Sequence, residues 1–189
     1  NFESKTFSSF SIPKVYQIMI EFLNTFMNDI KYKIGVDEVG RGPIAGPVCV
    51  CAFLVKDDNF LLSCTDESFI KENKLSRLKD SKKLSKKQRE EWSSFLYKAK
   101  DNNLCDFAVS FVSGEFIDKF GIAKCIQKAL DKSLDIVTSR ESSFSSWSGS
   151  SSSLIRGPEK KNFLERFIVF LDGGLHAPIE YVNQETIIK

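Results

Sequence analysis

Residues 34–48 read IGVDEVGRGPIAGPV, and the fold can be worked out from this stretch outward. A short apolar run at 33–37 is followed by the glycine turn Gly40-Arg41-Gly42-Pro43 and then by a second apolar run at 47–55. Short apolar runs bounded by Gly and Pro are typical of β-strands. The stretch therefore predicts two strands joined by a tight turn into a hairpin.

Two adjacent acids, Asp37 and Glu38, stand at the end of the first predicted strand. Neighbouring strand residues point to opposite faces, so both carboxylates reach one site only if the backbone bends there, as the following glycines permit. Carboxylates brought together need a proton or a hard cation between them, and oxygen ligands favour Mg²⁺ or Mn²⁺. The pair indicates a divalent-metal site. The alternative is a solvated strand end before a Gly-rich turn, because short motifs often mislead.

The rest of the chain alternates predicted helices and strands. A capping box at Ser85 and Gln88 begins a helix that ends near Lys100, strands follow at 106–112, 167–171 and 185–188, and Ser113 caps a helix that continues through residue 130. Strands first, then strands alternating with helices, indicate an α/β fold with a mixed sheet flanked by helices. Residues 11–26 have apolar residues at helical spacing and predict an amphipathic helix. We expect an N-terminal extension at 1–32 and one main domain at 33–189.

Two stretches interrupt this pattern. Residues 139–153 are dominated by serine and bury too little apolar surface to offset their ordering entropy, so they predict a disordered insertion. Residues 56–78 form a second long polar connection, in which a few apolar side chains are available as anchors.

The basic residues are clustered, although the net charge of the 189-residue chain is only +2. Such a cluster indicates a surface for nucleic acid, or else a solvated loop. Between residues 71 and 89 it is opposed only by Glu72 and Asp80, and it consists of Lys71, Lys74, Arg77, Lys79, Lys82, Lys83, Lys86, Lys87 and Arg89.

The cysteines indicate a reducing compartment. The five of them form no CxxC pair and leave an odd thiol, which fits neither a structural zinc site nor a secreted disulfide framework. The apolar stretch at 48–55 is too short to span a bilayer, and the N-terminus lacks the pattern of a signal peptide. We expect a soluble, cytoplasmic monomer with no membrane contact.

A third acid, Asp172, directly follows the apolar strand 167–171 and precedes Gly173-Gly174. Ligands of α/β sheets bind at the carboxyl ends of the strands, so Asp37, Glu38 and Asp172 converge if their two strands are neighbours. The alternative is an ordinary Asp-Gly turn. Together with the basic cluster, the three acids fit metal-assisted chemistry on a phosphodiester.

These motifs resemble the ribonuclease HII family. Residues 34–48 resemble its first signature block, and residues 78–85, LKDSKKLS, resemble its second. Residues 107–130 are similar to the next strand and helix of the family, and Phe170-Leu171-Asp172-Gly173 matches its third block. The matches extend in order from residue 33 to residue 189, apart from the insertions.

The resemblance implies a ribonuclease H-like fold and an endonuclease that uses two divalent cations, Mg²⁺ or Mn²⁺. Its substrates would be RNA–DNA hybrids and DNA duplexes containing ribonucleotides. Asp37, Glu38 and Asp172 would be the catalytic, metal-binding acids. The nucleic-acid contacts would come from two groups: Gly40, Arg41 and Gly42 at the ribose 2′-hydroxyl, and Ser81, Lys82 and Lys83 at backbone phosphates.

The sequence departs from the family pattern at Lys189, where the family continues into a Gly-Asp turn and a helix rich in small residues. A fourth acid and a stacking aromatic residue of the family lie in that segment. We therefore expect the parent protein to be active and this chain, as given, to be weakly active or inactive. A binding module without chemistry stays an alternative. A nucleotide-cradling turn at 40–46 is disfavoured because the spacing is GxGxxxG and the two acids repel phosphate. His176 is expected to be an ordinary loop residue, since hard cations prefer oxygen ligands.

Overall fold

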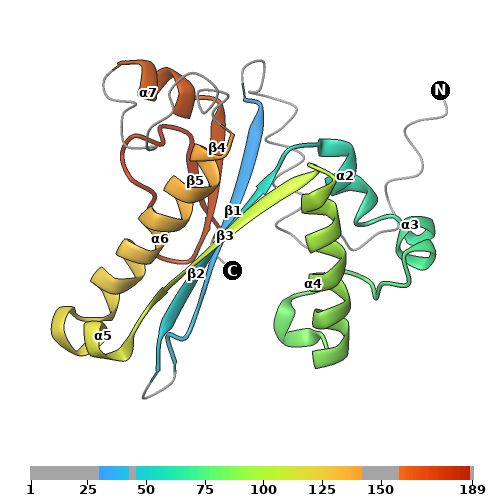
Figure 1. Ribbon diagram of the computed structural model, residues 1–189, viewed down its shortest axis with the longest axis horizontal. Helices are drawn as coiled ribbons and strands as arrows, with labels where there is room; N and C mark the ends of the chain where they lie inside the picture. Colours follow the sequence, from blue (N-terminus) through green and yellow to red (C-terminus); the bar gives the residue numbers. More distant parts are fainter. Residues whose placement is uncertain (1–29, 43–45, 142–157, 188–189) are drawn as a thin grey trace.

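The computed structural model describes residues 30–42, 46–141 and 158–187, and these form a five-stranded sheet with helices on both faces (Figure 1). The strand order is β3-β2-β1-β4-β5. The β1–β2 and β2–β3 pairs are antiparallel, and the β1–β4 and β4–β5 pairs are parallel. The predicted hairpin and mixed sheet are thus confirmed. The strands are β1 (Tyr32–Val39), β2 (Val48–Val55), β3 (Cys105–Val112), β4 (Phe167–Asp172) and β5 (Gln184–Ile187).

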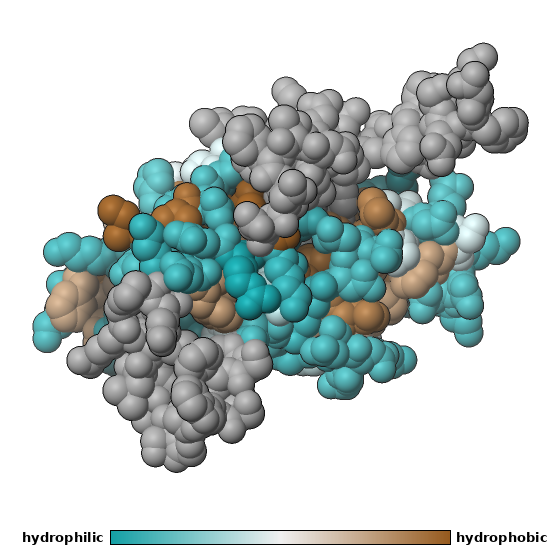
Figure 2. All heavy atoms as spheres, turned by 90° about the horizontal axis from the view of Figure 1, so that it is seen from above, coloured by the Kyte–Doolittle hydropathy of each residue, from teal (hydrophilic) through white to brown (hydrophobic). Residues whose placement is uncertain are grey.

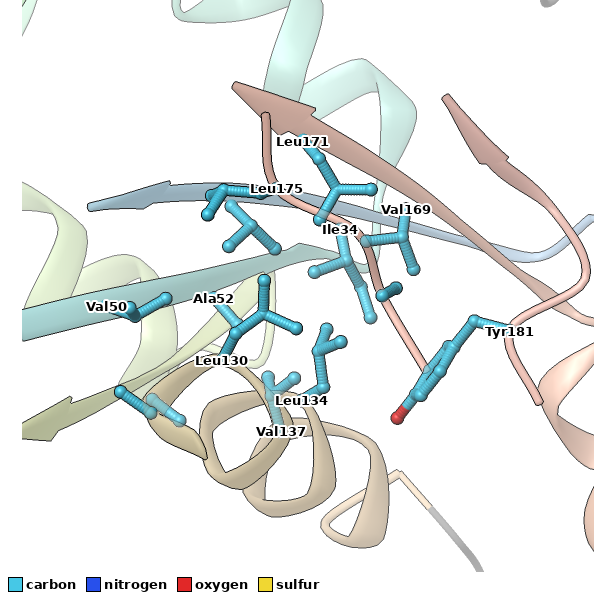
Figure 3. Close-up of a cluster of buried hydrophobic side chains, with 14 of the residues drawn as sticks. Ile34, Val50, Ala52, Leu130, Leu134, Val137, Val169, Leu171, Leu175 and Tyr181 are labelled. Carbon is cyan, nitrogen blue, oxygen red and sulfur yellow. The ribbon is translucent and has the colours of Figure 1, made fainter. Parts of the chain in front are cut away.

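The main core lies between one face of the sheet and α6 (Ile122–Ser139). Every second residue of β2 from Val48 to Leu54 is fully buried, which is the period of a strand with one face on a core. On the helix, Leu130, Leu134 and Val137 repeat at helical spacing and point at that face (Figure 3). The sequence pattern of each element therefore decides which side it buries.

A second core covers only part of the opposite face. Trp92 and Ala99 of α4 (Lys86–Asp101) pack with Phe60 of α2 (Asp58–Ser63) and with Cys105 at the start of β3. Cys105 is paired with Val55, and Val55 with Lys33, so this core lies at the end of the sheet where β1 begins. The other end of the same face stays open: Cys49 and Cys51 are half-buried there, and Val109 and Phe111 are 43% and 66% exposed.

The predicted helix start at Ser85 is confirmed. Ser85 and Gln88 make both hydrogen bonds of a capping box at the start of α4. The other helices are α3 (Glu67–Glu72), α5 (Gly114–Phe120), α7 (Pro158–Leu164) and a 3₁₀ turn, η1 (Ser81–Lys83). Among the described residues, no helix is long and apolar enough to cross a lipid bilayer.

The connection at 56–78 is more ordered than predicted, because it contains α2 and α3. The carboxylate of Asp57 accepts a hydrogen bond from the backbone N–H of Asn59, and that of Asp66 accepts one from Phe69, both at 2.9 Å. Capping by Asp stabilises a helix start, and the buried Phe60 and Ile70 then hold these short helices against the domain. The sequence signal for these two helices was the presence of a few apolar side chains in an otherwise polar segment.

The helix predicted from Ser113 onward is divided into α5 and α6 at Gly121, whose φ of +81° ends the first helical segment. Ser113 precedes α5 but makes no side-chain capping bond. α7 was not predicted. The helix expected at 11–26 and most of the serine-rich insertion at 139–153 lie outside the described residues, although Ser139 itself is the last residue of α6.

A buried carboxylate, Asp106, ties β3 to α4 and to the end of α6. It is 4% exposed and lies 2.5 Å from Lys100 Nζ and 3.2 Å from an Arg140 guanidinium nitrogen. The backbone N–H of Phe107 donates to the same oxygen at 2.7 Å. Burial alone would raise the pKa of Asp106, but these donors and cations together outweigh it and lower the pKa below its ordinary value.

We predict that Asp106→Asn destabilises the protein by about 1–3 kcal/mol at neutral pH, because two cations lose their partner while staying partly solvated. A lowered pKa in the folded state contributes stability above the unfolded pKa of about 3.9, and this contribution disappears as the pH falls through the lower, folded pKa. Denaturant unfolding of both proteins between neutral and acid pH measures this. A difference in unfolding free energy that does not shrink on acidification would contradict the prediction.

Candidate functional site

The carboxyl ends of β1 and β4 bring Asp37 and Asp172 next to each other. Val36 pairs with Leu171 in parallel register, and the two acids are the next residues on their strands. Val36 and Leu171 both belong to the core against α6, so the following side chains lie on the opposite face. Asp37 is exposed and Asp172 is half-buried. The two strands are therefore neighbours, as convergence of these acids required.

Glu38 lies on the other side of the strand. Pairing with β2 continues in unbroken register through Asp37, Glu38 and Val39, so the bend expected between the two acids is not present. Instead, Arg41 donates a hydrogen bond of 3.1 Å to Glu38 Oε1. The Glu38 side chain is only 13% exposed, and its buried Oε2 has no hydrogen-bond partner among the described residues.

The carboxylate oxygens at this strand end are the kind of ligand that a hard cation prefers. Among the described residues, however, fewer than three ligating side chains are grouped here. Asp37 and Asp172 offer carboxylate oxygens, which Mg²⁺ and Mn²⁺ prefer, and Glu38 Oε2 is a buried acceptor that lacks a partner within the described ranges. In the parts of the chain that the structure describes, no group of three or more His, Cys, Asp or Glu side chains is arranged to hold a metal ion. Two of the three predicted acids are thus brought together, and the third faces Arg41.

A backbone hydrogen bond and a strand partner define the surroundings of Asp37. Its Oδ1 accepts a hydrogen bond of 2.9 Å from the backbone N–H of Glu38. Cys51 is the direct partner of Asp37 on β2. Burial, with smaller effects from Cys49 and Asp37, raises the pKa of the Cys51 thiol to about 11. This thiol is protonated at neutral pH and offers no thiolate to a soft metal.

The glycine turn after β1 uses its first and second glycines differently. Gly40 has a φ of +99°, and a Cβ placed there would lie 2.5 Å from the Pro47 carbonyl oxygen. Gly42 is exposed, and a Cβ added to it meets no described atom within 4 Å. The turn itself requires glycine at position 40, whereas the described structure contains nothing that requires it at position 42.

The segment at 81–83 forms a rigid turn with its side chains outward. Asp80 Oδ1 accepts a hydrogen bond of 2.9 Å from the Lys82 N–H, and Arg89 donates one of 2.6 Å to the Leu84 carbonyl. Leu84 belongs to the second core, so η1 lies on the same side of the sheet as Asp37. The side chains of all three residues, Ser81, Lys82 and Lys83, are exposed. Asp80 therefore braces its loop.

His176 is an exposed residue of the loop between β4 and β5, and its carbonyl accepts a hydrogen bond of 3.0 Å from Gln127. Its imidazole forms part of no metal-ligating group among the described residues. Glu115 lies in the first turn of α5, where a negative charge complements the helix dipole.

The sequence of this chain is similar to known proteins. A family model described as ribonuclease HII matches residues 34–144, which include Asp37, the glycine turn and η1 but not Asp172. Ribonuclease HII of Shouchella clausii is 38% identical over 53% of this chain and 32% of its own length. Ribonuclease HII of Clostridium perfringens is 30% identical over 74% of this chain and 48% of its own length. The chain thus spans less than half of these relatives.

The chain is also similar to solved structures. The complex of PCNA with ribonuclease HII from Archaeoglobus fulgidus is 22% identical, with a TM-score of 0.46 over 83% of this chain and 60% of the other. Bst-ribonuclease HIII in complex with Mn²⁺ is 16% identical, with a TM-score of 0.47 over 82% of this chain and 41% of the other. The family assignment depends on the sequence match, which extends over more than half of the chain. This chain belongs to the ribonuclease HII family.

Proposed function

We propose that this protein is a metal-dependent endonuclease that hydrolyses the RNA strand of RNA–DNA hybrids and cuts at ribonucleotides embedded in duplex DNA. The observation that carries this proposal is the adjacency of Asp37 and Asp172 at neighbouring strand ends, on the open part of the sheet face. Adjacent carboxylates in an accessible position favour a hard cation between them. Membership of the family supplies the substrate class.

Asp37 and Asp172 would hold the cation. Glu38 lies on the other side of β1, so it would join them only if Arg41 is released and the end of the strand bends. Two bound Mg²⁺ or Mn²⁺ ions would supply the activation of a water molecule and the stabilisation of negative charge on the scissile phosphate and the leaving oxygen. The protein's own residues place the donors. The backbone N–H of Glu38 holds one oxygen of Asp37, and β4 presents Asp172 in register beside it. Arg41, once released, is free to meet a phosphate.

The glycine turn would read the ribose. Among the described residues, no atom lies within 4 Å of where a Gly42 side chain would begin, so a sugar could approach its backbone closely. The 2′-hydroxyl, both donor and acceptor, is the group that distinguishes RNA from DNA at such a contact. Ser81, Lys82 and Lys83 extend outward from η1 and would contact backbone phosphates, which positions the duplex without reading its sequence.

A labelled duplex with one ribonucleotide, incubated with the protein and Mg²⁺ or Mn²⁺, tests this function. We expect a single metal-dependent cut at the ribonucleotide and no cut in the same duplex made only of DNA. A second candidate is a nucleic-acid-binding domain without catalysis, which is favoured by the pairing of Glu38 with Arg41 away from Asp37. Binding of the duplex without any cut product under either metal would support that second function.

Phosphate binding by η1 predicts a change in salt dependence. In the double variant Lys82→Gln/Lys83→Gln, the slope of log affinity against log salt concentration should become flatter by about 0.9 for each phosphate that the protein no longer neutralises. Fluorescence anisotropy with a labelled duplex at several salt concentrations measures the slope. Lys161→Gln, an exposed lysine of α7, is the matched control. An unchanged slope in the double variant would contradict phosphate binding by η1.

A further inference from the structure

α5 lies beyond the end of the sheet, against the glycine turn. β3 leads into it at the end of the sheet where β1 ends, since Val112 pairs with Val48 and Val39 with Cys49 (Figure 1). A Cβ placed on Gly114, the first residue of α5, would lie 3.6 Å from the Gly46 carbonyl oxygen. Gly40 in turn lies against Pro47, the next residue. α5 therefore adjoins the turn that we assign to the ribose.

Two aromatic side chains of α5 are exposed side by side. Phe116 and Phe120 are each 44% exposed, and their ring centroids are 5.2 Å apart with an interplanar angle of 34°. Hydrophobic residues are visible among hydrophilic ones at the left end of the molecule in Figure 2, the end at which Figure 1 places α5. Phenylalanine is usually buried, so a pair of exposed rings beside a candidate binding turn needs a reason.

Lysines surround this pair. Lys128 Nζ lies 5.0 Å from the Phe116 centroid, and Lys119 Nζ lies 5.3 Å from the Phe120 centroid. Lys124, exposed, is one turn before Lys128 on α6. At 100° per residue, Asp118 lies about 160° around α5 from both rings, and Glu115 lies about 100° from the nearer one. Asp118 therefore faces away from the rings, Glu115 points to the side, and the charges nearest the rings are the lysines.

Positive charge combined with exposed flat rings is suited to a nucleic-acid strand. Base–aromatic stacking tolerates any base because every base has a π-face, while ammonium groups contact the phosphates between bases. Inside a duplex the base faces are already stacked on each other. Rings on a protein surface can stack only on unpaired bases, so the chemistry favours a single-stranded segment over the duplex itself.

We propose that Phe116, Phe120, Lys119 and Lys128, here called the α5 platform, bind unpaired bases of a strand that leaves the duplex held at the glycine turn. This inference depends on the proposed function, because the duplex contact comes from that site. The platform adds affinity for substrates with single-stranded tails and contributes nothing to a blunt duplex.

Fluorescence anisotropy without divalent cations, which prevents cutting, tests the platform. The probes are a labelled blunt duplex with one ribonucleotide and the same duplex with single-stranded tails. We expect the tails to tighten binding by the wild-type protein about tenfold or more, the range of base–aromatic stacking. The double variant Phe116→Ala/Phe120→Ala should lose this gain and bind the blunt duplex as the wild type does. Lys119→Gln/Lys128→Gln should flatten the salt slope only for the tailed duplex.

Two further variants test whether the gain requires aromatic rings and whether it requires the rings of α5. Phe116→Leu/Phe120→Leu keeps apolar surface without flat rings, and it should lose the gain as the alanine variant does. Tyr97→Ala, which removes a 58% exposed ring on α4, should keep the gain. A tail-dependent gain that persists in the alanine or leucine variant overturns the platform while the proposed function stands. If the wild-type protein binds neither duplex, both the proposed function and the platform fall.

Discussion

Asp37→Asn is expected to lower metal-dependent cleavage of a ribonucleotide-containing duplex by about a thousandfold. A bound cation stabilises charge in the transition state by several kcal/mol, and about 4 kcal/mol corresponds to a factor of a thousand in rate. Asparagine keeps the size of the side chain and can still accept the hydrogen bond from the Glu38 N–H, but it removes the negative charge. The measurement is the cleavage rate at saturating duplex, with Mg²⁺ and Mn²⁺ in turn.

Metal binding gives a readout that does not depend on catalysis. Calorimetric titration of the protein with Mn²⁺ should show binding to the wild type and loss of that binding in Asp37→Asn. Asp101→Asn, which removes an exposed carboxylate at the end of α4, is the matched control and should change neither property. The metal assignment is wrong if Asp37→Asn retains the wild-type rate, or if it binds Mn²⁺ as tightly as the wild type.

The second large effect is expected at the glycine turn. Substitution of Gly40 should affect mainly stability, and substitution of Gly42 should affect mainly cleavage. Gly40→Ala should destabilise the protein by about 2–4 kcal/mol, because its φ of +99° is unfavourable with a Cβ and that Cβ would meet the Pro47 oxygen. Gly42→Ala should leave stability within about 0.5 kcal/mol, since the added methyl group meets no described atom.

Gly42→Ala should nevertheless slow cleavage about a hundredfold, the effect of a misplacement of roughly 1 Å at a reacting group. Thermal unfolding and cleavage assays on both variants measure the two properties. Cleavage by Gly42→Ala should be slower because the methyl group occupies the space through which the ribose would approach the backbone. A stable Gly42→Ala variant with the wild-type rate would show that the sugar does not approach at this position, while an unaffected Gly40→Ala stability would contradict the turn geometry.

Much of the fold could be predicted because its signals are local. The apolar run at 47–55, which follows Gly46, marks β2, and the capping box at Ser85 marks the start of α4. The short helices α2 and α3 were missed because a polar segment with two caps and a few apolar anchors has little periodicity. The division between α5 and α6 was missed because a single glycine inside a helical pattern does not by itself end a helix.

For the candidate site, the sequence determined which acids stand at strand ends. These acids follow an apolar run and precede a glycine turn, and both features can be read directly from neighbouring residues. It also determined the family through contiguous motifs. Only the tertiary structure decided which side chains share a face. Asp37 meets Asp172 because β1 and β4 pair in parallel, and Glu38 faces Arg41 because pairing with β2 continues past it. Strand pairing and exposure depend on residues far apart in the chain, and no local pattern encodes them.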